Sequence, residues 1–130
     1  MCNTSLKIGL VGVCGAGKTT LTKGLNPFYK NVRQIAQEHS YVQDMWHRLV
    51  NPDVLIYLHV SYPVTLLRKP FRWNEKEYQE QIQRLRHANE HADLHIYTDN
   101  LSPNKVLEIV LKFLEEIDHF STHSKEQTSG

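Results

Sequence analysis

The sequence predicts an α/β protein in which helices cover both faces of a mostly parallel sheet of four or five strands. Two observations predict this fold class. Apolar runs typical of buried strands alternate, along 130 residues, with segments whose apolar residues recur at helical spacing. A glycine-rich segment also follows the first apolar run directly, as in turns that join a parallel strand to a helix. No repeat or linker interrupts this alternation, so we predict three layers, α/β/α, in a single domain at residues 1–120. The polar residues 121–130 are predicted to form a disordered tail.

The elements follow in chain order from their apolar patterns and their breakers. The first half is predicted to hold a strand at 6–12, a helix from residue 17 to the Asn26-Pro27 break, a strand at 32–36 and a helix across 42–49. The second half is predicted to hold a strand at 53–60, a short helix from residue 61, a charged helix at 74–92, a strand at 94–97 and a final helix from residue 103. The run at 53–60 is apolar on both faces, as expected of a central parallel strand.

Composition limits the classes of function. The formal net charge is +1, with 40% hydrophobic and 22% charged residues, so bulk charge gives no case for nucleic-acid or membrane binding. No apolar run approaches the roughly 20 residues of a membrane-spanning helix. The two cysteines, Cys2 and Cys14, do not form a disulfide framework, and we therefore expect a reducing, cytoplasmic setting.

The glycine-rich segment carries the clearest functional signal. It reads Gly12-Val13-Cys14-Gly15-Ala16-Gly17-Lys18-Thr19 and fits the pattern G-x-x-x-x-G-K-[ST] at every position. Glycines let the backbone curl so that successive N–H groups point toward one anion, and the following helix adds the positive end of its dipole. Lysine can then reach the outer phosphates of a nucleotide, and the threonine hydroxyl can complete the ligand shell of Mg²⁺.

We therefore expect the chain to bind a nucleoside triphosphate together with Mg²⁺. The residues expected to contact it are Gly12, Val13, Cys14, Gly15, Ala16, Gly17, Lys18, Thr19 and Thr20. ATP is the expected nucleotide because the D-x-x-G and N-K-x-D patterns of GTPases are missing from the sequence. GTP stays an alternative, since no pattern here selects adenine positively.

Transfer of a phosphoryl group needs a carboxylate that holds Mg²⁺ or its waters. With Thr19, the candidate is Glu38, because the carboxyl end of a strand at 32–36 faces the glycine-rich segment if that strand lies beside the first. A solvated loop glutamate is an equally open interpretation, and Asp44 and Asp99 are further candidates.

A basic connector at residues 68–73 supplies candidate catalytic cations besides Lys18. Arg68 and Arg72 can close over a triphosphate and stabilise charge on the transferred group. An ordinary place on the protein surface is the alternative for both.

The segment 51–61, with its strand Val54-Leu55-Ile56-Tyr57-Leu58-His59-Val60, resembles the fourth-strand region of nucleoside and nucleotide kinases, and Asp99-Asn100-Leu101-Ser102-Pro103 resembles the turn before their last helix. With the glycine-rich segment, the chain thus resembles a miniature thymidylate kinase-like member of the P-loop NTPases. The resemblance implies an ATP-dependent phosphotransferase, or a hydrolase, with a small-molecule phosphate acceptor that it does not identify. Two departures stand against this: the chain is much shorter than those kinases, and His59 replaces a common aspartate. A non-catalytic nucleotide-sensing module that binds a partner protein is therefore the alternative.

Overall fold

The computed structural model describes residues 6–68 and 73–129, which form a parallel four-stranded sheet with helices around it. The strands are β1 (Ile8–Gly12), β2 (Val32–Gln34), β3 (Val54–His59) and β4 (Leu94–Tyr97). They lie in the order β2-β1-β3-β4, and each of the three pairings is parallel. The predicted α/β class is confirmed, with four strands, and β2 lies beside β1 as the interpretation of Glu38 required.

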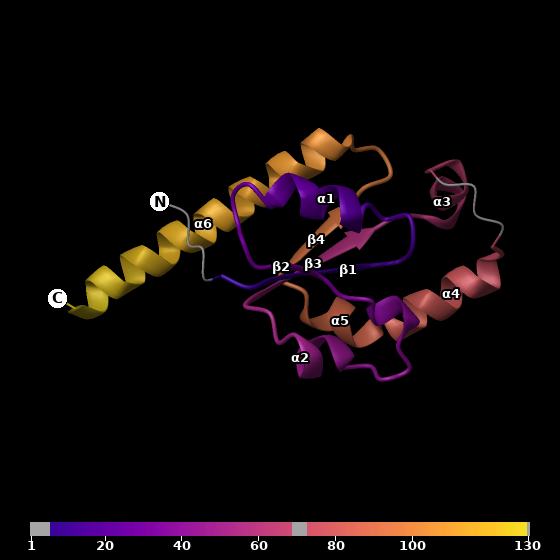
Figure 1. Cartoon of the computed structure of the whole chain (residues 1–130), viewed down its shortest axis with the longest axis horizontal. Coiled ribbons are helices and arrows are strands. Elements are labelled where there is room, and N and C mark those ends of the chain that lie inside the picture. Colours follow the sequence, from indigo (N-terminus) through magenta and orange to yellow (C-terminus); the bar gives the residue numbers. More distant parts are fainter. Residues whose placement is uncertain (1–5, 69–72, 130) are drawn as a thin grey trace.

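Helices cover both faces of the sheet (Figure 1). On one face lie α1 (Lys18–Leu25) and α6 (Pro103–Ser129), which also contact each other. The opposite side holds α2 (Met45–Leu49), α4 (Glu75–Arg84) and α5 (Arg86–His91). The remaining short elements are the 3₁₀ turn η1 (Gln37–His39) and α3 (Tyr62–Arg68). This arrangement is compatible with the three layers that the sequence predicts.

The core lies on the two central strands. All five residues of β1 and the first five of β3 are buried. Because helices cover both faces, these strands carry continuous apolar runs instead of alternating apolar and polar residues. Their carboxyl ends share one edge of the sheet, which is where a parallel α/β sheet offers room for a ligand.

Three elements differ from the sequence prediction. The strand predicted at 32–36 ends at Gln34, and the chain then turns into η1. The helix predicted across 42–49 starts only at Met45, because Val42 is exposed and has no core to pack on. The helix predicted at 74–92 divides at Leu85, whose fully buried side chain lies at the bend between α4 and α5.

The last helix is longer than the sequence predicts. It continues through residues 121–129, which the polar composition assigns to a disordered tail. No proline or glycine lies between Pro103 and Gly130, so nothing in this stretch of the sequence interrupts the helical hydrogen bonds. Within the described part of the chain, no helix is both long and apolar enough to cross a membrane.

Candidate functional site

The glycine-rich loop, residues 12–19, connects the carboxyl end of β1 to the first turn of α1. At Gly12 the backbone passes so close to β3 that an added Cβ atom would lie 2.6 Å from the Leu58 carbonyl oxygen. At Gly17, which precedes α1, φ is 102°, in the left-handed region that favours glycine. These two positions let the loop leave the buried strand and enter the helix within a few residues.

The start of α1 presents main-chain donors. The amide groups of Lys18, Thr19 and Thr20 lie in the first turn, where a helix has no preceding carbonyl to accept from them. The Leu21 amide is the first to donate within the helix, to the Gly17 carbonyl at 3.0 Å. No acidic residue lies in this first turn. Free amides and an uncompensated helix dipole together give this end of α1 a partial positive charge.

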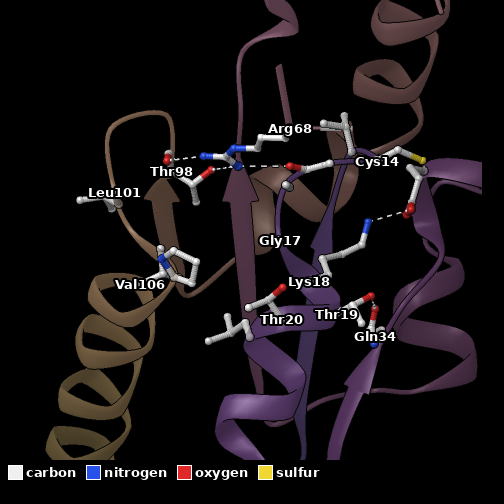
Figure 2. Close-up of a pocket in the computed structure, with 16 residues that line it drawn as sticks. Cys14, Gly17, Lys18, Thr19, Thr20, Gln34, Arg68, Thr98, Leu101 and Val106 are labelled. Carbon is white, nitrogen blue, oxygen red and sulfur yellow. Dashed lines mark hydrogen bonds and ion pairs between the residues drawn. The ribbon is translucent and has the colours of Figure 1, made fainter. Parts of the chain in front are cut away.

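A cavity of about 670 Å³ lies in front of the loop (Figure 2). This volume is within the range typical of small-molecule sites, roughly 300–1,000 Å³. All of the predicted nucleotide-binding residues except Gly12 line it, and so do Glu38 and Arg68. The other lining residues come from α1, from the end of β2, from the connection that follows β4 and from the start of α6: Leu21, Gln34, Thr98, Leu101, Pro103 and Val106.

Lys18 and Glu38 form an ion pair inside this site. The Lys18 Nζ donates to the Glu38 Oε2 at 2.7 Å (Figure 2). It also donates to the carbonyl of Gly12. Exposed fractions of 11% and 6% for the two side chains show that the pair is largely shielded from water. The structure therefore brings together two predicted site residues and pairs them with each other.

Buried Gln37 anchors the turn that carries Glu38. The Gln37 side chain accepts from the Trp46 amide and donates to the carbonyls of Val42 and Arg84. This fixes η1 against α2 and α4 and places the Glu38 carboxylate at the loop. The second carboxylate oxygen, Oε1, is buried and has no hydrogen-bond partner among the described residues.

Thr19, the other predicted magnesium ligand, lines the same cavity. Its Oγ1 donates to the Gln34 Oε1 at 3.0 Å, at the end of β2. Sequence reasoning missed Gln34, although its place at the carboxyl end of the second strand is a signal that could have found it.

Arg68, the last residue of α3, contacts the glycine-rich loop. Its guanidinium donates to the Gly15 carbonyl at 3.1 Å, and to the Thr98 Oγ1 and carbonyl at 3.0 and 2.5 Å (Figure 2). It thus ties the loop to the end of β4. Thr98 was missed from the sequence, where a lone threonine after a strand carries no signal. Arg72 lies outside the described residues.

Gln81 on α4 also contacts the loop, at Cys14. Its Oε1 accepts from the Cys14 amide at 3.0 Å, and its Nε2 lies 3.4 Å from the Cys14 Sγ. Gln81 is buried, with 7% of the residue exposed. Sequence reasoning also missed this contact, because the two residues are 67 positions apart.

A smaller hollow of about 350 Å³ lies at the carboxyl ends of β3 and β4. Its wall includes His59, whose Nε2 lies 2.9 Å from the His95 Nδ1 and whose ring stacks on Tyr57 and Tyr97. Burial, followed by the neighbouring His95, lowers the pKa of His59 to about 4. At neutral pH the histidine is therefore uncharged.

The chain matches no protein-family model, and no curated protein or solved structure is significantly similar to it.

Proposed function

We propose that this chain binds a nucleoside triphosphate with Mg²⁺ at the glycine-rich loop and acts on the terminal phosphate as a small phosphotransferase or NTP hydrolase. One observation carries the proposal. The loop that fits G-x-x-x-x-G-K-[ST] lies between a parallel strand and a helix, and it opens onto a cavity of about 670 Å³. The pattern is typical of a phosphate-binding loop when a strand precedes it and a helix follows it, as β1 and α1 do here.

The charge distribution supports an anionic ligand. Helix-terminal amides, the Lys18 ammonium and the Arg68 guanidinium all border the cavity. Lys18 already has an anionic partner in Glu38, so a bound phosphate replaces one negative charge at Lys18 with another. Phosphate binding therefore leaves no ammonium without a partner.

The oxygen donors fit magnesium. Mg²⁺ prefers hard oxygen ligands and usually keeps several waters, so it needs few protein ligands. The Thr19 hydroxyl and the Glu38 carboxylate line the cavity, and the buried Oε1 of Glu38 lacks a hydrogen-bond donor among the described residues. When bound, the ion neutralises charge on the phosphate oxygens.

The remaining wall suits a nucleotide base. Leu101, Pro103 and Val106 form an apolar strip beside the loop, on which a purine ring can pack. This strip has no side chain that selects adenine over guanine. ATP is therefore the first probe and GTP the second.

Arg68 is proposed to stabilise charge on the transferred phosphoryl group. It already donates to the Gly15 carbonyl, and its guanidinium is part of the cavity wall. A small molecule is the class of phosphate acceptor that we propose.

A nucleotide-sensing module that binds a partner protein is the second candidate. A specific observation favours it: among the described residues that line the cavity, Glu38 has the one carboxylate, and it is paired with Lys18. A separate base to activate a phosphate acceptor is missing from that set. In this alternative, a nucleotide phosphate replaces Glu38 at Lys18 and thereby shifts η1, the turn that carries Glu38. The shift changes the surface to which the partner protein binds.

Thermal unfolding with ATP and Mg²⁺ tests the binding site. A ligand at 100 times its Kd stabilises the folded state by about 2.7 kcal/mol, or roughly 5–12 °C in Tm for a domain of this size. Lys18→Ala should abolish this shift while the ligand-free protein stays folded. Lys23→Ala, an exposed lysine later in α1, is the matched control and should keep the shift. An equal shift in Lys18→Ala would overturn the site assignment.

Nucleotide consumption separates the two candidates. Protein is incubated with ATP, Mg²⁺ and pooled nucleosides or small metabolites, with Lys18→Ala as the blank. Turnover above that blank supports the enzyme. Tight ATP binding without turnover supports the sensor.

A further inference from the structure

We propose that Cys14, Glu38 and His39 form a second kind of cation site, which binds a thiophilic divalent ion of the zinc class at the rim of the glycine-rich loop. This inference does not rest on nucleotide binding, because it follows from three side chains and their contacts alone.

The three ligand atoms lie near one another. The Cys14 Sγ is 3.7 Å from the His39 Nε2, and that nitrogen is 3.8 Å from the Glu38 Oε2. All three fall within 4.8 Å of one another, and no other group of three His, Cys, Asp or Glu side chains among residues 6–68 and 73–117 matches this. Tetrahedral zinc with bonds of about 2.0–2.3 Å separates its ligands by about 3.3–3.6 Å. Small side-chain movements therefore close the site around an ion.

The carboxylate gives an independent reason to expect a cation. Glu38 is 5% exposed, and its Oε1 is buried without a hydrogen-bond donor among the described residues. An oxygen of this kind is costly to bury unless it gains a partner. A metal ion bound by the carboxylate provides one.

The ligand set determines the kind of ion. A thiolate is a soft ligand that magnesium and calcium avoid, whereas thiolate with imidazole and carboxylate suits zinc. Three protein ligands leave the fourth position open for water or another group. The His39 side chain is 58% exposed, so an ion can enter from solvent.

Gln81 acts as a positioning residue. It accepts from the Cys14 amide and lies 3.4 Å from the Cys14 sulfur, so it fixes the orientation of this ligand. On binding, the Cys14 thiol loses its proton to solvent, and the sulfur forms a bond with the ion. One proton is thus released for each ion bound at a pH where the thiol is protonated.

Lys18 opposes the ion. Its ammonium lies 2.7 Å from the same carboxylate, and a dication held by Glu38 meets a like charge at close range. Lys18→Ala should therefore strengthen metal binding by roughly tenfold, which corresponds to the removal of about 1.4 kcal/mol of charge repulsion. The same variant should weaken ATP binding, which separates the two sites experimentally.

Titration with Co²⁺ tests the proposal, because Co²⁺ occupies zinc sites and gives a thiolate-to-metal charge-transfer band. Reduced, chelator-treated protein without nucleotide should bind one Co²⁺ per chain with this band, and Zn²⁺ should displace it. Cys14→Ser should abolish the band, and His39→Ala should lower the affinity by more than about tenfold. His47→Ala removes an exposed histidine on α2 and is the control that should bind normally.

Two results would overturn the inference. One is Co²⁺ binding of equal affinity in wild type, Cys14→Ser and His39→Ala, and the other is the lack of any charge-transfer band in folded wild-type protein. Far-ultraviolet circular dichroism of each variant checks that it is folded. If ATP fails to bind while the Co²⁺ results hold, the proposed function falls and the metal site stands.

Discussion

Replacing Glu38 by glutamine removes the negative charge beside Lys18 and nearly conserves the size of the side chain. We expect this variant to bind metal-free ATP more tightly than wild type. The reason is that a nucleotide phosphate must draw Lys18 away from Glu38, and the variant no longer opposes that movement. In the presence of Mg²⁺, the same variant should gain less affinity from the ion, because the proposed carboxylate ligand is missing.

The size of the first effect follows from the ion pair. At an N–O separation of 2.7 Å, the gross Coulomb attraction is about 6 kcal/mol for an effective dielectric constant of about 20. Desolvation of two largely buried groups offsets most of this, so a net coupling of about 1–2 kcal/mol is expected. Removing that coupling raises the metal-free affinity by about 5–30-fold.

Isothermal titration of ATP provides the assay, performed once in chelator and once in excess Mg²⁺. Glu108→Gln is the control, because Glu108 forms an exposed pair with Lys105 on α6 at 3.5 Å. This control should leave both affinities unchanged. A metal-free affinity of Glu38→Gln equal to or below that of wild type would refute the reasoning about Lys18.

Three further predictions concern the loop and the sheet edge. Gly12→Ala should lower the free energy of unfolding in urea by about 2–4 kcal/mol, because its Cβ would lie 2.6 Å from the Leu58 carbonyl oxygen. Arg68→Ala should weaken ATP binding by about tenfold and lower the free energy of unfolding by about 1 kcal/mol, since its bonds to Thr98 and the loop are lost. Stability should also fall between pH 6.5 and 4, because the pKa of His59 is lowered from 6.5 to about 4 and the unfolded chain takes up the proton first. For this half-exposed histidine we expect a loss of about 1 kcal/mol, which His59→Phe should remove.

Each of these predictions has a result that contradicts it. An unfolding free energy for Gly12→Ala within about 0.5 kcal/mol of wild type would show that the loop does not pass so close to β3. Unchanged ATP affinity in Arg68→Ala would return Arg68 to a structural role. A pH profile of stability that is the same in wild type and His59→Phe would mean that another group titrates in that range.

Local patterns predicted much of the fold. The apolar runs of β1 and β3 and the Ser102-Pro103 start of α6 are short-range signals, and the structure places all three close to their expected bounds. The limits of β2 and the division of the helix at Leu85 were not predictable in the same way. They depend on which side chains reach the core, and burial of Leu85 is a property of the tertiary packing.

The candidate site was predictable where one continuous motif carries it. The glycine-rich loop could be identified from spacing alone, and the neighbouring position of β2 made Glu38 a reasonable candidate. Pairing of Glu38 with Lys18 could not be predicted, because it depends on how η1 packs against α4. The contacts from Gln81 and Thr98 were missed for the same reason, since they join residues far apart in the sequence.

Backbone amide chemical shifts measured during titration with ATP and Mg²⁺ test the central claim most directly. The account predicts that the largest changes fall on the amides of residues 14–20, that they saturate at one nucleotide per chain, and that Lys18→Ala removes them. Saturating changes centred elsewhere in the chain, or no changes at the loop at millimolar nucleotide, would contradict it.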